Sequence, residues 1–382
     1  MRILFPKMFG CGESSIKLNT KFTILLALFF IVVFLFLVIP SKHHKLPKLA
    51  MIYEPTDFAR PFNRTYPFTA RFIDEEGNIH MRLALISDPD TKSKLEENTW
   101  VSKLQFAELI LDSEWKTANL LLKEKCDIRN QYAYKGRGSE FSELIAFNGD
   151  LYTVDDRTGI IYRFIAKCPD PELIPWVILS DGPGNMNKGF KAEWLAVKDD
   201  VMFVGGMGKP FSDPMTGQVI NNDPMYVKAI SHTGQVQHLD WRQNYRNMLN
   251  SLSLAPSGYL LHEAAAWSQH HKQWFFLPRR ESSEMYNEVV DEEKGTNVVI
   301  RTSSTFSNVK YSRLPAAPIK KRGFSSFKFV PHTNDLIIIG IKTKEFKGEV
   351  ASYATVFKTN MDLLMEEIEI SPTDKFEGVE FV

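Results

Sequence analysis

The chain has 382 residues, of which 44% are hydrophobic and 24% are charged, and this balance excludes a disordered or collagen-like protein. Lys and Arg together number 46, as do Asp and Glu, so the formal net charge is zero and provides no global field that would attract nucleic acid. The three cysteines form no CxxC pair and no Cys/His cluster, which excludes a disulfide-built scaffold and leaves a structural zinc site unsupported.

The first strong feature along the chain is an apolar run from Phe22 to Ile39 that no charged residue interrupts. At about 1.5 Å per residue in a helix, this run spans roughly 27 Å, which is enough to cross a bilayer. It is longer than the core of a cleavable signal peptide and ends in bulky residues rather than at a small-residue cleavage site. We therefore predict an uncleaved signal anchor. The chain then divides into a cytoplasmic tail (1–21), a transmembrane helix (22–40), a luminal stalk (41–79) and a folded domain (80–382).

The orientation of the folded domain rests on weaker signals. Basic residues lie on both sides of the apolar run, so the positive-inside rule decides little. The sequon Asn63-Arg64-Thr65 and the short N-terminal tail favour a type II protein whose folded domain faces the lumen. In that oxidising compartment Cys126 and Cys168 would be either a disulfide or two buried thiols, and the sequence does not decide between them.

From about residue 80 onward the chain consists of short apolar segments separated by turns, which is typical of an all-β domain. One pattern recurs: a Ser or Glu opens a short apolar strand, a polar turn follows, and a second apolar strand returns. In the first copy Ser142 opens the strand and Asn148-Gly149 forms the turn, which is a strong hairpin signal. Further copies open at Glu193, Glu263 and Ser325.

The two ends of the domain complete the repeat. A fifth opening occurs at Glu377, but the chain stops before a return strand, and Arg82–Asp88 has the form of the missing partner. The successive openings are 51, 70, 62 and 52 residues apart, which is the range of β-propeller blades with some long loops. The sequence therefore predicts an all-β, five-bladed β-propeller closed by its own ends. The alternative is a β-sandwich whose strands merely begin with Ser and Glu, and the third copy is the weakest because Ala264–Ala266 is poor strand material.

In a closed propeller the innermost strands line the axis, so the five opening residues would converge there. These residues are Ser142, Glu193, Glu263, Ser325 and Glu377. Three carboxylates brought together would repel one another unless a cation lies among them. Coordination by oxygens from separate blades suits Ca²⁺ better than Mg²⁺, so we predict a central calcium site. The alternative is that the serines simply cap strand ends.

Because the blades are antiparallel, the end of each return strand lies at the same mouth of the axis as the opening residues. Candidate groups there are Asp88, Asp90, Asp155–Arg157, the Gly205–Lys209 loop, Arg279, Arg280 and Lys342, the last lying just after the fourth return strand, which is expected to end at Gly340. Arginine, lysine and glycine amides can hold phosphate oxygens, and an aspartate can orient or deprotonate a water nucleophile. We assign the carboxylate role to Asp88 and Asp156. The ordinary alternatives are a surface pair of Asp155 with Arg157, and solvated loop charges at Arg279 and Arg280.

These residues lie in longer motifs by which the chain resembles the calcium-dependent apyrases, also called soluble calcium-activated nucleotidases. The motifs are Glu96–Trp100, Lys135–Gly138, Val154–Gly159, Trp176–Gly182, Lys188–Lys198, Trp274–Arg280 and Gly323–Phe329, and the resemblance runs from about Leu83 to Val382. It implies a five-bladed propeller with calcium in its central tunnel and hydrolysis of UDP and GDP to the monophosphate and phosphate. It places the calcium ligands on Ser142, Glu193, Glu263, Ser325 and Glu377, functionally sensitive acids on Asp88 and Asp156, and an important arginine on Arg279.

Members of this family occur as type II membrane proteins of the endoplasmic reticulum and Golgi, and some are released by cleavage of the stalk. The resemblance therefore implies a luminal enzyme that removes the nucleoside diphosphates released by glycosyl transfer. The rival functions are a propeller glycosidase that uses Glu193 and Glu263 as acid and base, and a noncatalytic propeller in which calcium only stabilises a binding face. The sequence leaves open the nucleotide preference and whether the chain is a monomer or a homodimer.

Overall fold

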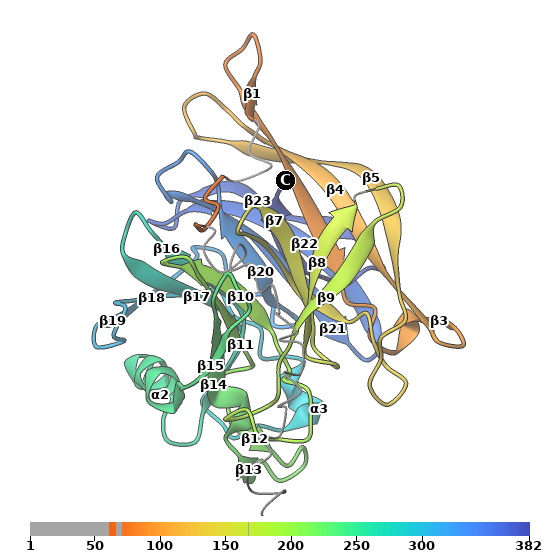
Figure 1. Ribbon diagram of the computed structural model, residues 1–382. Helices are drawn as coiled ribbons and strands as arrows, with labels where there is room; N and C mark the ends of the chain where they lie inside the picture. Colours follow the sequence, from red (N-terminus) through yellow and green to blue (C-terminus); the bar gives the residue numbers. More distant parts are fainter. Residues whose placement is uncertain (1–60, 66–70, 167) are drawn as a thin grey trace, which may run out of the picture. The chain divides into compact units, whose positions relative to one another are not determined.

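Short runs of apolar residues form the strands of this protein, and the strands assemble into separate antiparallel sheets (Figure 1). The computed structural model describes residues 61–65, 71–166 and 168–382. The predicted tail (1–21) and transmembrane helix (22–40) lie outside these residues, as does much of the predicted stalk. Within the described part of the chain, no helix has the length and apolar character needed to cross a membrane.

Five of the sheets each contain a four-stranded blade that runs from an innermost to an outermost strand. Blades one to five have as innermost strands β24 (Phe376–Phe381), β6 (Phe141–Phe147), β10 (Trp194–Lys198), β16 (Tyr259–Ser268) and β20 (Arg322–Phe329). The second strands, in the same order, are β2 (Ile79–Ser87), β7 (Asp150–Asp155), β11 (Val201–Gly205), β17 (Gln273–Ser282) and β21 (Ile337–Phe346). The third strands are β4 (Thr99–Leu111), β8 (Ile160–Ala166), β14 (Tyr226–Ile230), β18 (Val298–Thr302) and β22 (Glu349–Lys358). The outermost strands are β5 (Ala118–Asn130), β9 (Glu172–Ile178), β15 (Val236–Asp240), β19 (Val309–Arg313) and β23 (Leu363–Ser371).

Short elements decorate the blades. Two strands, β1 (Arg71–Ile73) and β3 (Lys94–Glu96), extend the sheet of blade one, and β12 (Phe211–Ser212) pairs with β13 (Val219–Asn221) after β11. The helical elements are η1 (Asp90–Ser93), η2 (Asp223–Met225), α2 (Arg242–Ser251) and α3 (Glu288–Asp291).

The innermost strands form a closed ring, which confirms the predicted five-bladed propeller. Neighbouring innermost strands contact one another in the cycle β6, β10, β16, β20, β24 and back to β6. The ring closes within blade one, where β24 from the C-terminus pairs with β2 from the start of the domain, with Leu83 opposite Phe381 and Leu85 opposite Val379. Closure by the chain ends removes the exposed sheet edge that an open ring would carry.

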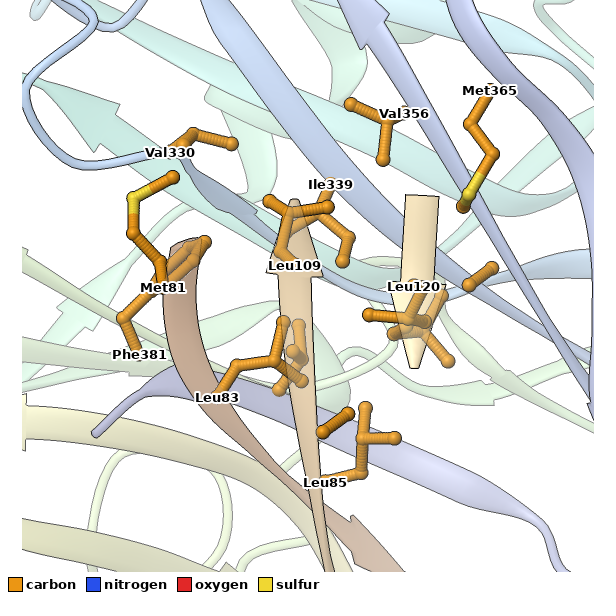
Figure 2. Packing of buried hydrophobic residues seen from close by; sticks show 14 of the residues in the cluster. Met81, Leu83, Leu85, Leu109, Leu120, Val330, Ile339, Val356, Met365 and Phe381 are labelled. Atoms are coloured by element: carbon orange, nitrogen blue, oxygen red, sulfur yellow. The ribbon is translucent and has the colours of Figure 1, made fainter. Parts of the chain in front are cut away.

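Apolar residues between blades five and one hold the closure together. Figure 2 shows Leu83 and Leu85 of β2 and Phe381 of β24 in one buried cluster with Ile339 of β21 and Val356 of β22. Burying such a side chain contributes about 1.5–3 kcal/mol relative to leaving it exposed. The closing strand is therefore fixed by packing as well as by its hydrogen bonds.

Two strands differ from what the sequence predicts. β16 forms despite its alanines because tertiary packing overrides their low strand propensity: Ala264 and Ala265 are buried, and Ala265 lies in a cluster with Trp194 and Trp274. The expected end of the fourth return strand at Gly340 is wrong, since β21 continues to Phe346 through its pairing with β22. Lys342 therefore lies within the strand, where its Nζ donates to Glu367 Oε2 at 2.9 Å.

The predicted sequon lies at the edge of blade two. The backbone N–H of Asn63 donates to Asn148 Oδ1 at 2.8 Å, and the ring of Phe62 packs against that of Phe147 with a centroid distance of 5.2 Å. The Asn63 side chain is exposed. The segment therefore contacts the β6–β7 turn while leaving the asparagine accessible.

A disulfide joins Cys126 of β5 to Cys168, which follows β8, and so decides the alternative that the sequence left open. The bond links blade one to blade two across a sequence separation of 42 residues. A crosslink of this kind stabilises the fold mainly by restricting the unfolded chain.

We expect Cys126→Ser combined with Cys168→Ser to lower the free energy of unfolding by about 3–4 kcal/mol, the value for a loop of this length. Denaturant unfolding of the oxidised protein and the double variant measures the difference, and Cys11→Ser provides the control. Reaction of both Cys126 and Cys168 with a thiol reagent in the native, unreduced protein would contradict the assignment.

Candidate functional site

The five predicted opening residues lie in or directly before the innermost strands, one in each blade. They are Ser142 in β6, Glu193 directly before β10, Glu263 in β16, Ser325 in β20 and Glu377 in β24. All five side chains are buried. Ser142 and Glu377 are the second residues of their strands, whereas Glu263 and Ser325 lie further inside theirs.

Arg279 of β17 joins two of the glutamates across blades. Its Nη1 contacts Glu263 Oε2 and donates to Glu377 Oε1 at 2.8 Å, and its Nη2 donates to Glu345 Oε2 at 2.9 Å. The guanidinium is buried, so these are not the solvated loop charges of the alternative prediction. Hydrogen bonds between charged groups at this depth are stronger than surface pairs.

Two lysines make similar bridges on the other sides of the ring. Lys191 Nζ lies 2.6 Å from Glu193 Oε1 and 2.7 Å from Asp156 Oδ2. Lys375 Nζ lies 2.8 Å from Asp88 Oδ2 and 3.4 Å from Glu377 Oε1. The structure thus brings the predicted catalytic acids, Asp88 and Asp156, to the predicted metal-ligand glutamates through shared lysines.

Glu193, Glu263 and Glu377, here called the acidic ring, are buried, and burial disfavours their charged forms. Burial raises the pKa of Glu193 well above its ordinary value, Lys191 opposes the shift, and the charges of Glu263, Asp156 and Glu377 add to it. Burial also raises the pKa of Glu377, with Lys375 opposing and Glu263 adding to the shift. The carboxylates thus act on one another's charge, and a cation bound among them would relieve their repulsion.

A tighter acidic cluster lies beside this ring. Asp88, Asp90 and Glu140 each offer a carboxylate oxygen, and these atoms lie within 4.8 Å of one another. Basic side chains surround the cluster: Arg137 Nε donates to Glu140 Oε1 at 2.7 Å, and Lys375 Nζ donates to Asp90 Oδ2 at 2.7 Å. Burial raises the pKa of Glu140 to about 7. Glu140 is buried and stands two residues before Ser142.

The neighbouring aspartates 155 and 156 have separate roles. The buried carboxylate of Asp155 accepts hydrogen bonds from the backbone N–H groups of Ser139, Arg157 and Thr158, so it shapes the turn after β7 and makes no surface pair with Arg157. Asp156 points one oxygen at Lys191, while its Oδ1 is buried without a hydrogen-bond partner in the described part of the chain. The free oxygen is a chemically available acceptor at the mouth.

The sequence interpretation missed several residues of this site. Glu140, Lys191 and Lys375 each stand two positions before an opening residue, and residues two apart in an extended chain point to the same side. This spacing of two residues could have predicted that the three side chains lie beside the opening residues. Glu345 was missed because β21 was expected to end earlier.

Comparisons with known proteins agree with this architecture. The family model described as Apyrase matches residues 88–382. Soluble calcium-activated nucleotidase 1 of Rattus norvegicus is 43% identical over 323 residues, which cover 84% of this chain and 78% of that protein. An apyrase of Cimex lectularius is 39% identical over 84% of this chain and 87% of its own length, and the apyrase apy-1 of Caenorhabditis elegans is 38% identical over 80% and 86%. Identity at this level over most of the chain shows that the protein belongs to the apyrase family.

Proposed function

We propose that the protein is a Ca²⁺-dependent nucleoside-diphosphate phosphohydrolase that converts UDP and GDP to the monophosphate and phosphate. Membership of the apyrase family makes the chain a nucleotide-hydrolysing enzyme, and a relative named as calcium-activated supports the choice of metal. The observation that carries the proposal is the set of five buried, oxygen-bearing side chains that lie in or directly before the innermost strands, namely Ser142, Glu193, Glu263, Ser325 and Glu377.

The donor chemistry of this set fits calcium. Carboxylates and hydroxyls offer only oxygen ligands, and their origin on separate strands suits the irregular coordination of Ca²⁺. The hydroxyl of Ser142 is buried without a hydrogen-bond partner in the described residues, so strand capping does not account for it. Ser325 Oγ donates to Phe376 O at 2.8 Å and keeps its lone pairs for a ligand. When bound, Ca²⁺ would offset the charge of the phosphate oxygens and polarise the phosphorus toward water.

The protein's own groups would bind the substrate and orient the water. Arg279 presents a guanidinium at the ring and would bind phosphate oxygens in a fork. Asp156, fixed through Oδ2 by Lys191, would accept a hydrogen bond from the attacking water through its free Oδ1 and take its proton. Asp88, held by Lys375, is the second carboxylate in reach of this role. The water adds to the terminal phosphorus as the bond to the monophosphate oxygen breaks.

We place this reaction in the lumen of the endoplasmic reticulum or Golgi, in a type II protein with a tail at 1–21, a membrane anchor at 22–40 and a stalk at 41–79. The disulfide between Cys126 and Cys168 supports an oxidising compartment. The exposed side chain of Asn63 is accessible for glycosylation there. Cleavage of the stalk would release the enzyme.

Removal of calcium is expected to abolish phosphate release from UDP, because the buried carboxylates lose the cation that offsets their charge. Phosphate and reducing sugar are measured for a panel of nucleotides and glycosides in EGTA, and then after addition of Ca²⁺ or Mg²⁺. Recovery with Ca²⁺ alone is the expected result, since Mg²⁺ demands a near-octahedral site. Undiminished UDP hydrolysis in excess EGTA, or release of sugar instead of phosphate, would contradict the proposal.

Glu193→Gln is expected to weaken Ca²⁺ binding by about tenfold or more, because affinity depends on the number of charged ligands. The amide keeps an oxygen for the hydrogen bond from Lys191, so the fold should persist. Titration calorimetry gives the affinity, and the calcium dependence of UDP hydrolysis should shift with it. Glu284→Gln, which alters a glutamate paired with Lys294 away from the ring, is the control. Equal calcium affinity in both variants would remove Glu193 from the metal site.

Asp156→Asn is expected to lower kcat for UDP by about 10²–10⁴-fold, the contribution of a positioned general base, with little change in Ca²⁺ affinity. Steady-state kinetics at saturating calcium checks the first effect and calorimetry checks the second. Asp240→Asn, in which an exposed aspartate paired with Arg242 is neutralised, is the matched control. A kcat equal to that of the control would assign the proton transfer elsewhere.

A further inference from the structure

Arg280 is a buried cation that the mechanism above does not use. It follows Arg279 on β17, at a point where the pairing of β16 with β17 is irregular, and it is 3% exposed. Its Nε and Nη1 have no hydrogen-bond partner in the described part of the chain, and Asp291 Oδ2 lies 3.8 Å from Nε. The buried donors of a guanidinium are costly to leave unpaired, so Arg280 has spare capacity to bind an anion.

Lys209 is a second buried cation that lies within the influence of the same acid, Asp291. It is 5% exposed, its Nζ donates to Pro210 O at 3.2 Å, and the ammonium lies 3.8 Å from the ring centroid of Tyr286. Burial lowers the pKa of Lys209 to about 8, and only the charge of Asp291 opposes this shift. The negative charge of Asp291 therefore acts on both Lys209 and Arg280. Its Oδ2 lies near Arg280, while its Oδ1 already accepts a hydrogen bond from Tyr259 Oη.

The loop after β11 is built to bring Lys209 to this position. Gly208 has a φ of +72°, and a Cβ at this residue would lie 2.5 Å from Tyr245 Cε1 and 2.7 Å from His262 Cδ2. Only glycine allows the backbone to descend onto these two rings. The glycines of the loop therefore position the lysine, which follows immediately.

These cations adjoin the ring and not a separate surface. The charges of Lys191 and Arg280 both act on the Tyr286 hydroxyl, whose pKa burial raises to about 12. Next to Lys209 lies a cavity of about 190 Å³, and His262, whose Nδ1 has no hydrogen-bond partner in the described residues, lines it. A larger cavity of about 550 Å³ lies beside Asp88, but there Arg137, Lys103 and Lys375 all contact carboxylates.

Resting on the diphosphatase function proposed above, we infer that Lys209 and Arg280 bind the phosphate that stays with the nucleoside, and that the nucleoside extends into the cavity beside Lys209. The terminal phosphate then lies over the ring with Arg279, and the two arginines, which are neighbours in the sequence, hold successive phosphates. Arginine and lysine suit this task because they supply charged donors to phosphate oxygens. A substrate must then carry two adjacent phosphates, and the released monophosphate is the natural competitive inhibitor.

Lys209→Met and Arg280→Gln test this assignment in the full chain with saturating Ca²⁺. Each variant is expected to weaken binding of UMP by about tenfold and to raise KM for UDP similarly, because a charged hydrogen bond to phosphate is lost. The kcat should fall less than KM rises, and calcium affinity should stay unchanged. Lys294→Met and Arg313→Gln are the controls, since these residues pair with Glu284 and Glu281 outside the ring.

The outcomes separate the subsite from the reaction. If the wild type hydrolyses UDP with calcium but both variants bind UMP as tightly as the controls, the subsite is overturned and the proposed function stands. If the wild type does not hydrolyse UDP, the proposed function fails and the subsite with it. If melting shows that Arg280→Gln is unfolded, Lys209→Met and Arg280→Lys decide the matter, and wild-type UMP affinity in Lys209→Met overturns the subsite.

Discussion

The structure depends on like charges that are buried together at the end of the propeller ring. Glu193, Glu263 and Glu377 come from strands that line one axis, and each contacts a cation: the half-buried Lys191 for the first and the buried Arg279 for the other two. Loss of one partner from a buried ion pair typically costs about 3–5 kcal/mol, because it leaves a charge without compensation. The basic residues thus hold the carboxylates in place, and the residual repulsion among the carboxylates is what the proposed Ca²⁺ would offset.

The same strand closes the propeller and completes the candidate site. β24 completes blade one by pairing with β2, and the same strand carries Glu377. The acidic ring is therefore complete only after the two ends of the domain have met. Below it, Glu143 follows Ser142 in β6, accepts a hydrogen bond from Ser326 Oγ at 2.7 Å and lies 3.0 Å from Lys328 Nζ. This second layer of paired charge ties blade two to blade five and supports the ring from beneath.

The sequence was most informative where the physics is local and repeated. Hairpin turns, alternating apolar strands and the recurring Ser or Glu predicted the propeller, its closure by Arg82–Asp88 and the five opening positions. It was least informative where tertiary contacts decide: β16 forms around Ala264 because its neighbours supply bulky rings, and β21 runs past Gly340 because β22 continues to pair with it. The lysines that bridge the carboxylates were partly predictable. Lys191 and Lys375 each stand two residues before a glutamate of the acidic ring, which is visible in the sequence, but the sequence does not show which carboxylates each lysine contacts.

The two neighbouring arginines of β17 differ in how fully they are paired, and this difference gives the proposed site a direction. Arg279 contacts three carboxylates of the acidic ring and its surroundings, whereas Arg280 lies near one, Asp291, at 3.8 Å. Lys209, in the loop between β11 and β12, is also influenced by Asp291. The site is therefore acidic at its centre and basic toward the β11–β12 loop. The proposed diphosphate would lose its favourable contacts if it were reversed, because its nucleoside would then face the paired charges around Asp88. The orientation of the substrate thus follows from the unequal pairing of two adjacent arginines.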